Sequence, residues 1–263
     1  MNVIVCMKQV PDTETLIKIK SDGSGIVTDD IKVVMNPYCE FAVEEALRIK
    51  EKFGGQAILV TMGPPKAVEA LRTGLAMGAD RSLHLNDPAF EGADGFATAK
   101  ALAEAIRKEP FDLILCGKQA VDDDMAQVGP SLAELLNLPH VTLITKLEIS
   151  PDQKKAKVER EVEGGKEVIE VSLPAVFTCQ KGLNEPRYAS LPGIMKAKKK
   201  EVKLFNLAGL GLPADQVGAA GSKAKIMKYI PPPARPPGKI VSGEVIDAAK
   251  KLVKLLREEA KII

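Results

Sequence analysis

The chain has 263 residues, of which 45% are apolar and 27% charged, a balance typical of a globular protein. Lys and Arg number 37 and Asp and Glu 35, so the formal net charge is only +2, and Trp is absent. Nucleic acid is therefore not expected as a partner, because neither a field of one sign nor a set of stacking aromatics is present. The apolar runs are too short to insert into a membrane. Met1 leads directly into an apolar run without a basic n-region, which favours the cytoplasm, or the mitochondrial matrix in a eukaryote.

The cysteines and histidines do not form a local metal or redox motif. The four cysteines are Cys6, Cys39, Cys116 and Cys179. Because they contain no C-x-x-C pair, an iron–sulfur cluster, a zinc ribbon or a catalytic dithiol is not expected. His84 and His140 each lie beside an expected strand, where a hydrogen-bonded structural histidine is favoured over a metal ligand. No G-x-S-x-G motif is present, so no hydrolase nucleophile is expected.

The first half of the chain alternates apolar runs with amphipathic segments. Residues 3–7 predict a buried strand, and residues 16–20 and 26–27 around a Gly- and Ser-rich turn predict a hairpin. Asn36 followed by Pro37 predicts a helix with Asn36 as its N-cap, ending at Gly54. Further strands are expected at 57–62, 82–85 and 113–116, with helices at 65–77, 94–108 (capped by Asp94) and 131–136. This order predicts an α/β fold with a mainly parallel sheet flanked by helices.

The second half has a different character. Residues 157–162 and 167–171 predict a hairpin around Gly164-Gly165, and residues 173–179 a further buried strand. Residues 183–200 predict a loop that ends in several lysines, and residues 205–239 an extended arm without regular structure. Residues 243–261 predict an amphipathic terminal helix. We therefore expect an α/β domain over residues 1–204 and, over 205–263, a C-terminal arm and helix that pack on a partner subunit.

Ligands of parallel α/β sheets bind beyond the carboxyl ends of the strands. Four loops qualify here: those after Cys6, before Pro37, after Met62 and after Cys116. The last begins with Gly117, where the backbone could closely approach a ligand, and its exposed amides could cradle a phosphate. The three consecutive aspartates at 122–124 would repel additional phosphate charge. The residues alone leave open a nucleotide monophosphate site and a merely acidic surface loop.

Three segments of the chain resemble the beta subunit of electron-transfer flavoprotein. They are residues 36–46, which begin Asn-Pro-Tyr-Cys-Glu, the loop 117–129, and residues 183–200, which begin Leu-Asn-Glu-Pro-Arg-Tyr-Ala. The Val-Glu-Arg at 158–160 and the Leu-Pro-Ala-Val at 173–176 resemble the family's signature region. The resemblance covers residues 1 to about 200 and, more loosely, the arm.

This resemblance implies an electron-carrier subunit rather than an enzyme in its own right. The expected partner is an alpha subunit that holds most of the FAD. Electrons would come from dehydrogenases, typically the acyl-CoA dehydrogenases of fatty acid oxidation, and pass to a quinone-linked oxidoreductase. A stand-alone adenine-nucleotide-binding protein or hydrolase of similar fold is a third reading, which is disfavoured because residues 8–11 after the first strand do not match the Ser-Gly-Gly-x-Asp loop of such proteins.

The resemblance also implies a structural AMP in this subunit. The positions that match the family's nucleotide site are Cys6, Asn36, Pro37, Tyr38, Cys39, Met62, Thr98, Gly117, Lys118, Gln119, Ala120, Val121, Asp122, Asp123, Asp124, Met125, Ala126, Gln127 and Val128. Members of the electron-bifurcating branch bind a second FAD there and carry Asp-Gly-Asp-Thr at 122–125 and threonines at both 95 and 98. This chain lacks two of those hydroxyls and has an additional carboxylate, which favours AMP. Residues 7–13 and 127–130 nevertheless resemble the bifurcating branch, so a second FAD remains the alternative.

Residues 187–196 resemble the family's partner-recognition loop. The matching positions are Arg187, Tyr188, Leu191, Pro192, Met195 and Lys196. Leu191 resembles the apolar anchor, and burial of one Leu contributes ~2 kcal/mol, a weak contact suited to a shuttle. The adjacent lysines would steer acidic partners and raise the encounter rate. Without the resemblance, the same residues predict a Leu191 that packs internally and lysines that only increase solubility.

Overall fold

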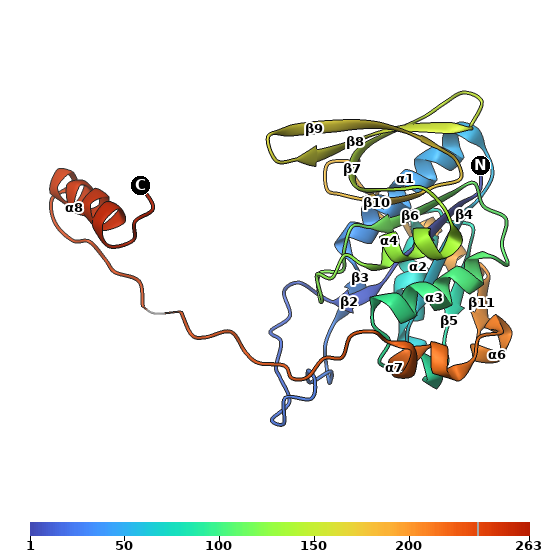
Figure 1. Ribbon diagram of the computed structural model, residues 1–263, viewed down its shortest axis with the longest axis horizontal. Coiled ribbons are helices and arrows are strands. Elements are labelled where there is room, and N and C mark those ends of the chain that lie inside the picture. Colours follow the sequence, from blue (N-terminus) through green and yellow to red (C-terminus); the bar gives the residue numbers. More distant parts are fainter. Residues whose placement is uncertain (236) are drawn as a thin grey trace. The chain divides into compact units, whose positions relative to one another are not determined.

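A computed structural model describes residues 1–235 and 237–263 of the chain (Figure 1). These residues form two compact units: one comprises Met1–Lys18 and Val27–Met227, and the other comprises Ile19–Ile26 and Lys228–Ile263. The first unit has the expected α/β fold. The expected boundary between residues 204 and 205 falls inside the strand β11 (Val202–Phe205), and the first unit continues well beyond it.

Within the described residues, nine strands form one sheet in the order β11-β5-β4-β1-β6-β10-β7-β8-β9. Their bounds are Val3–Cys6 (β1), Ala57–Met62 (β4), Arg81–Leu85 (β5), Leu113–Gly117 (β6), His140–Ile149 (β7), Lys155–Val162 (β8), Gly165–Ser172 (β9), Val176–Cys179 (β10) and Val202–Phe205 (β11). All pairs from β11 through β7 are parallel, while β8 pairs antiparallel with both β7 and β9. The predicted mainly parallel sheet is confirmed.

Several strands were not predicted. β7 and β11 belong to the main sheet, and β2 (Gln9–Pro11) pairs antiparallel with β3 (Val33–Met35) in a separate small sheet. Only Val141 and Ile144 are buried among the ten residues of β7, and β11 is an edge strand, so neither has the continuous apolar run of a central strand. The hairpin expected over 16–27 is wrong as a pair of strands, because it contains a single bridge between Ile19 and Ile26.

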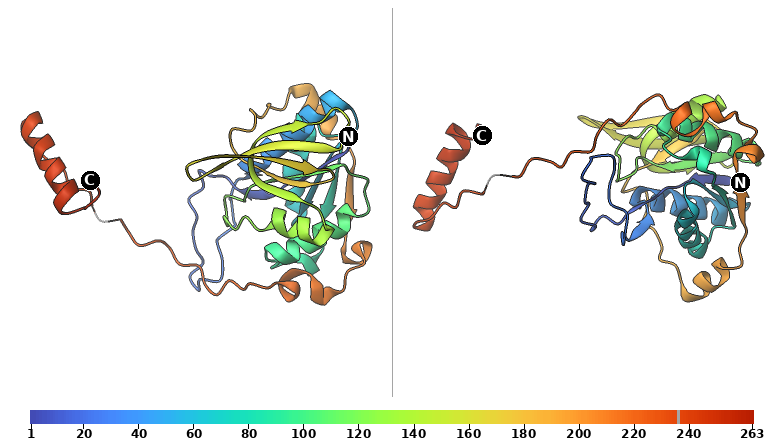
Figure 2. Two further views of the ribbon diagram at one scale, coloured as in Figure 1. Left: turned by 45° about the horizontal axis from the view of Figure 1, so that its top comes forward. Right: turned by 90° about the horizontal axis from the view of Figure 1, so that it is seen from below.

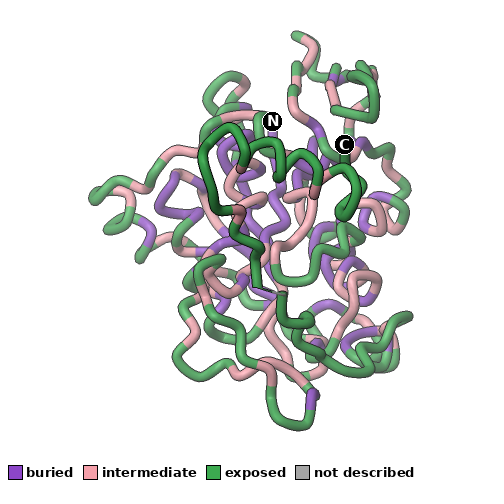
Figure 3. Tube along the Cα trace, turned by 90° about the vertical axis from the view of Figure 1, so that its left-hand side faces the viewer, coloured by how far each residue is buried: buried purple, intermediate pink, exposed green. Residues whose placement is uncertain are grey.

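Helices cover both faces of the parallel part of the sheet (Figure 2). α1 (Pro37–Phe53) and α2 (Val68–Met77) pack with Val3 and Val5 of β1 on one face. α3 (Gly95–Ile106) and α4 (Val128–Leu136) pack with Ile4 and Cys6 on the other. Buried residues accordingly gather in the interior of the first unit (Figure 3). The central strands alternate their side chains between two apolar layers. Single turns of 3₁₀-helix at Pro65–Ala67 and Pro88–Phe90 precede α2 and α3.

The region from 183 to 221 is more regular than predicted. It contains α5 (Leu191–Ala197), α6 (Leu207–Leu210), a 3₁₀ turn at Ala214–Gln216 and α7 (Gly218–Gly221). The expectation that residues 205–239 lack regular structure is therefore wrong for 207–221. Polar side chains stabilise these short turns: Asn206 Oδ1 accepts from the Gly209 amide at 2.8 Å, and Asp87 Oδ2 from the Leu207 amide at 3.0 Å.

The second unit contains the arm from Lys228 onward and the terminal helix α8 (Val245–Glu258), while the earlier part of the arm belongs to the first unit. Residues 231–235 and 237–242 have no helix or strand, as expected, and Pro236 lies outside the described residues. Val245 is 82% exposed and Ile246 70%, so the apolar side of α8 lies open along much of its length within the unit. In the described ranges 1–235 and 237–263, we find no helix with both the length and the apolar character that a transmembrane segment requires.

We predict that Leu59→Ala destabilises the protein far more than Leu204→Ala. Leu59 is fully buried in β4, whereas Leu204 of β11 is 69% exposed. Truncation of a buried Leu leaves a cavity and costs ~2–5 kcal/mol, while the same change at the surface usually stays within ~0.5 kcal/mol. Urea unfolding of both variants measures the difference. Equal shifts of the two midpoints would contradict this assignment of the core.

Candidate functional site

The strand order reverses at β1. From β1 the chain adds β4 and then β5 on one side, and returns to add β6 on the other. Cys6 at the end of β1 is in register with Cys116 near the end of β6. In open α/β sheets this reversal leaves a site at the carboxyl ends of the two diverging strands. The loop 117–128, which the sequence singled out, begins directly at this position.

The Asn36 side chain joins the beginning of α1 to this loop. Its Nδ2 donates to the carbonyl of Gln119 at 2.8 Å, and its Oδ1 accepts from the Val121 amide at 3.1 Å. Asn36 is 1% exposed, so these bonds are shielded from water. Asn36 is the N-cap residue of α1 and Pro37 its first residue, as predicted, but the Asn36 side chain makes no cap hydrogen bond at this N-terminus. The carboxamide is used instead for the contact between helix and loop.

Gly117 allows α1 and the loop to approach each other. A Cβ at this position would lie 2.8 Å from the carbonyl carbon of Tyr38 and 2.9 Å from the amide nitrogen of Cys39. The sequence predicts that Gly117 allows close approach to a ligand. In the structure, the atoms that a Cβ at this position would meet belong instead to the first turn of α1. Lys118, the next residue, lies over the Tyr38 ring with its Nζ 4.7 Å from the ring centre. The structure thus brings 36–39 and 117–121 together.

The aspartates of the loop are largely paired within the chain. Lys8 Nζ lies 2.8 Å from Asp122 Oδ1 and 2.9 Å from Asp123 Oδ2. Desolvation lowers the pKa of Lys8, but the bonds to the two aspartates outweigh it and leave the pKa raised. Gln119 Nε2 donates to Asp124 Oδ1 at 2.5 Å. Repulsion of phosphate by three free carboxylates, which the sequence suggested, is therefore reduced.

The loop continues past Met125 and Ala126 to Gln127, the residue before α4. Asp124 and Ala126 have φ angles of +51° and +52°, so the backbone turns sharply here. A Cβ on Gly95 would lie 3.1 Å from the Cβ of Gln127, which brings the start of α3 next to the end of the loop. Thr98 lies about one turn further along α3. Met62 ends β4 and packs on the apolar layer with Cys6, at the same edge of the sheet.

The helices at this edge differ in how they begin. Asp94 Oδ1 accepts from the Ala97 amide at 2.8 Å, so α3 has a side-chain cap, as predicted. No side-chain cap bond is present at the start of α1 or of α4. Uncapped helix N-termini offer backbone N–H groups and a positive dipole end to an anion.

The cysteines lie buried close to the same edge. The neighbouring Cys116 thiol and burial together raise the pKa of Cys6 well above its ordinary value, and burial raises the pKa of Cys39 and Cys179. Asn36 Nδ2 also approaches Cys39 Sγ at 3.2 Å. Neutral buried thiols are poor nucleophiles, so these cysteines act as small apolar side chains of the core. His84 is buried with Nε2 3.1 Å from the Gly63 carbonyl, which confirms its structural role, whereas His140 is exposed.

The residues that resemble a recognition loop form an exposed apolar face on α5 and the segment before it. Tyr188 is 97% exposed, Leu191 79% and Met195 71%. Pro192 and Lys196 are also exposed. The alternative in which Leu191 packs internally is therefore wrong. Ser190 Oγ accepts from the Gly193 amide at 3.2 Å and caps the helix that begins at Leu191.

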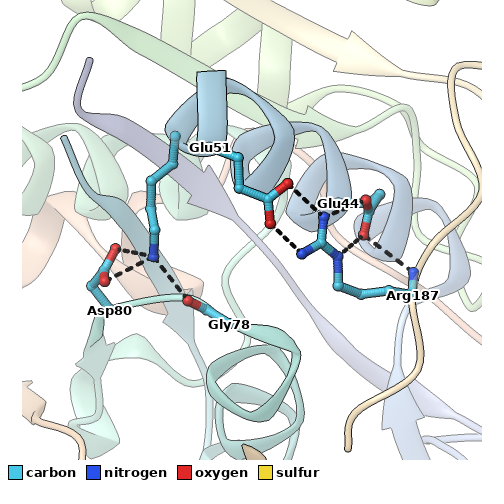
Figure 4. A network of polar contacts seen from close by, with 6 residues as sticks. Glu44, Glu51, Gly78, Asp80 and Arg187 are labelled. Atoms are coloured by element: carbon cyan, nitrogen blue, oxygen red, sulfur yellow. Dashed lines mark hydrogen bonds and ion pairs between the residues drawn. The ribbon is translucent and has the colours of Figure 1, made fainter. Parts of the chain in front are cut away.

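Arg187 is bound within the chain rather than free at the surface (Figure 4). Its Nε donates to Glu44 Oε2 at 2.8 Å, and its Nη1 to Glu51 Oε1 at 2.5 Å, both carboxylates being on α1. The hydrogen bond from Arg187 is the main cause that lowers the pKa of Glu51. Because the pKa of Glu51 is lowered by folding, its pair with Arg187 stabilises the fold at pH values above the pKa of Glu51 in the unfolded chain. This stabilisation is lost as the pH falls through the lower pKa of Glu51 in the folded protein.

Lys8, Glu44 and Glu51 were not predicted from the sequence as contacts of the 117–128 loop or of Arg187. Glu44 is 5% exposed, an unusual burial for a carboxylate. A weak signal was present, because Glu44 and Glu45 interrupt the run of Ala and Val on the inner side of α1. Arg187, the partner of Glu44, is 143 positions away in the sequence, and Asn184, the partner of Glu45, is 139 positions away, so no local pattern encodes these contacts.

Comparisons with known proteins place this chain in a family. Residues 24–210 match the model described as the electron transfer flavoprotein domain. An electron transfer flavoprotein subunit beta from Bacillus subtilis is 44% identical over 265 residues, covering 100% of both chains. The pig protein of the same description is 42% identical, covering 100% of this chain and 99% of its own. The chain belongs to the electron transfer flavoprotein family, as a beta-subunit member.

Family membership confirms the resemblance found in the sequence and supports a role in electron transfer within a flavin-containing complex. A third relative, the Caffeyl-CoA reductase-Etf complex subunit CarD of Acetobacterium woodii, is 42% identical and covers 98% of this chain and 99% of its own. The electron transfer flavoprotein match includes Asn36, the loop 117–128 and the segment 187–197, whereas Cys6 and Lys8 lie before its first residue.

We predict that Gly117→Ala destabilises the protein, whereas Gly165→Ala has little effect. The new Cβ at 117 would collide with the α1 backbone, while at 165 no atom lies within 4 Å. Thermal unfolding and hydrogen exchange at the first amides of α1 report on the collision. Faster exchange should be confined to Gly117→Ala. An unchanged variant at 117 would show that the close packing of α1 on this loop is not needed.

Proposed function

We propose that this chain is the beta subunit of a heterodimeric electron transfer flavoprotein that carries electrons from acyl-CoA or related dehydrogenases to a quinone-linked oxidoreductase. In this proposal the subunit holds a structural AMP and acts in the cytoplasm, or in the mitochondrial matrix of a eukaryote. The observation that carries the nucleotide site is the loop 117–128, which follows the reversal of strand order and is tied to α1 by Asn36. The redox chemistry would come from FAD, held mainly by the alpha subunit.

The residues at this site fit an adenylate. The uncapped starts of α1 and α4 support phosphate binding, since backbone amides there can donate to its oxygens. Asn36 and Gly117 would keep the loop close to the first turn of α1, and Gln119 and Val121 would hold its backbone in place through Asn36. Residues 122 to 128 would close the site towards α3, where Gly95 contacts Gln127.

The second unit supports an alpha subunit as the partner. Val245, Ile246 and Val253 give α8 an apolar side that the unit itself leaves exposed, while Lys250, Lys251 and Lys254 make its other positions polar. An amphipathic helix without a core of its own needs a second surface to cover this side. We propose that the alpha subunit supplies that surface.

The exposed face formed by Tyr188, Leu191 and Met195 supports a docking role towards the donor dehydrogenase. Its few apolar side chains suit a short-lived contact, because a small interface gives weak binding. Pro192 is the second residue of the helix, and Lys196 adds charge beside the face. We propose that Arg187 contributes indirectly, by holding this segment on α1, since Glu44 and Glu51 occupy its guanidinium.

A second FAD in place of AMP is the alternative. The similarity to CarD, a subunit of a reductase–Etf complex by its name, supports it, as do the segments 7–13 and 127–130. The pairing of Asp122 and Asp123 with Lys8 also weakens the charge argument against a diphosphate. The missing hydroxyls at Gly95 and Met125 still favour AMP.

The nucleotide content of the purified heterodimer tests the proposal. Denaturation and chromatography should release one FAD and one AMP per heterodimer. Asn36→Ala should lower the AMP occupancy, because the loop loses both of its bonds to this side chain, whereas Asn206→Ala, which removes only the α6 cap, should not. Release of two FAD molecules would support the alternative and reject AMP. An isolated chain that is yellow and redox-active would reject the subunit assignment.

We predict that Leu191→Ala slows reduction by the donor dehydrogenase without loss of nucleotide. Loss of a buried Leu contact worth ~2 kcal/mol should raise the donor KM by about tenfold or more. The matched control is Leu204→Ala, which removes another exposed leucine from β11. Steady-state kinetics with varied donor concentration measures the effect. Identical kinetics for the Leu191 variant and the control would remove Leu191 as an anchor.

A further inference from the structure

Two cations join α5 to α2. Arg72, on α2, donates from Nη1 to the carbonyl of Ala197 at 2.5 Å and to that of Lys200 at 2.8 Å. In the opposite direction, Lys200 donates from Nζ to the carbonyl of Leu75 at 3.0 Å and to that of Ala79. Each cation therefore reaches the carbonyl groups at or just beyond the end of the other helix.

This arrangement is a reciprocal C-terminal cap. The last four carbonyls of an α-helix have no partner within the helix, and the helix dipole places partial negative charge there. Ala197 is the last residue of α5, and Leu75 lies in the last turn of α2. Arg72 lies on α2, and Lys200 lies three residues after the end of α5, so movement of either helix end would break bonds of both cations.

The two helices also touch closely at the start of α5. A Cβ on Gly193 would collide with the carbonyl oxygen of Ala76 near the end of α2. Ala197 is 2% exposed, so the C-terminal turn of α5 is packed against the rest of the unit. Leu191 and Met195 lie on the same short helix and remain exposed. The cap thus holds the inner side of a helix whose outer side is open.

The four lysines in the last turn of α5 and directly after it differ in their exposure and contacts. Lys196, Lys198 and Lys199 are exposed, whereas Lys200 is partly buried, and desolvation lowers its pKa. Its Nζ is committed to two backbone carbonyls. From the sequence, all four lysines were expected to act alike as steering charges, and for Lys200 the geometry does not fit that role.

We propose that Arg72 and Lys200 are positioning residues that fix the orientation of α5 and hence of the face that docks the donor dehydrogenase. This inference rests on the docking role proposed above for Leu191. The exposed lysines then determine how fast the donor dehydrogenase encounters this subunit, while the reciprocal cap determines how well the oriented α5 binds the donor after the encounter. The two effects are separable, since salt screens the steering by exposed lysines strongly and the partly buried cap much less.

The test uses the purified heterodimer and an acyl-CoA dehydrogenase as the donor. The variants are Arg72→Gln, Arg72→Lys and Lys200→Met, and the matched control is Lys198→Met, which removes an exposed lysine two positions away. Hydrogen exchange of amides 193–197 measures the order of α5 without a donor. Donor kinetics over a range of salt concentrations measure KM and kcat, and nucleotide content checks the integrity of each variant.

For Arg72→Gln and Lys200→Met we expect exchange in α5 to rise by about tenfold, because each variant loses hydrogen bonds from a charged donor to two backbone carbonyls. The donor KM should rise several-fold at every salt concentration, with kcat and nucleotide content unchanged. Arg72→Lys keeps the charge and should lie between these variants and wild type. Lys198→Met should leave exchange unchanged and raise KM only at low salt.

Two outcomes would overturn the proposal. One is a Lys200→Met variant that behaves like Lys198→Met, with unchanged exchange and a salt-dependent KM. The other is faster exchange in α5 with unchanged donor kinetics, in a heterodimer where Leu191→Ala does slow the donor. If Leu191→Ala itself has no effect, the docking role fails, and the exchange data then separately report whether the cap orders α5. Should Lys200→Met fail to assemble, the graded pair at Arg72 gives the same decision.

Discussion

The carboxamide of Asn36 is the contact on which the proposed nucleotide site depends, because it connects two segments that the strand order only brings into the same neighbourhood. The reversal at β1 and β6 leaves their carboxyl ends side by side, but it does not fix the long loop after β6. The donor and acceptor groups of Asn36 bind both sides of residue 120, through the Gln119 carbonyl and the Val121 amide. Since the side chain is 1% exposed, loss of either bond would leave a buried polar group unpaired.

Much of the fold could be predicted from local pattern. The runs at 3–7, 57–62 and 113–116 are apolar throughout because their strands are buried on both faces, and all three became central strands. The helices that start at Pro37 and after Asp94 carry their signals in the first residues. The four loops of the candidate site followed from the alternation of these elements. Such features depend on neighbours within a few residues, which sequence periodicity records directly.

What could not be predicted depends on distant partners. β11 is defined by its pairing with β5, about 120 positions earlier in the chain, and its own residues are mostly exposed. Asn36 has the right residue type for an N-cap, and only the folded loop offers it better partners. Lys8 lies in the loop after β1, and no residue near it in the sequence predicts its ion pairs with Asp122 and Asp123. In each case a long-range contact overrode the local preference.

The Lys8 pairing also changes the electrostatic argument about the nucleotide. Three aspartates in a row suggest a site that repels a second phosphate, but a carboxylate that shares an ammonium at 2.8 Å exerts a weaker field on its surroundings. The preference for AMP therefore depends less on charge and more on hydroxyl donors, of which Gly95 and Met125 supply none. At Gly95 the structure adds a steric reason: a Cβ there would lie 3.1 Å from both Cβ and Oε1 of Gln127. A threonine at 95 would thus require Gln127 to move. The absence of a side chain at Gly95 therefore makes room for the Gln127 side chain before α4.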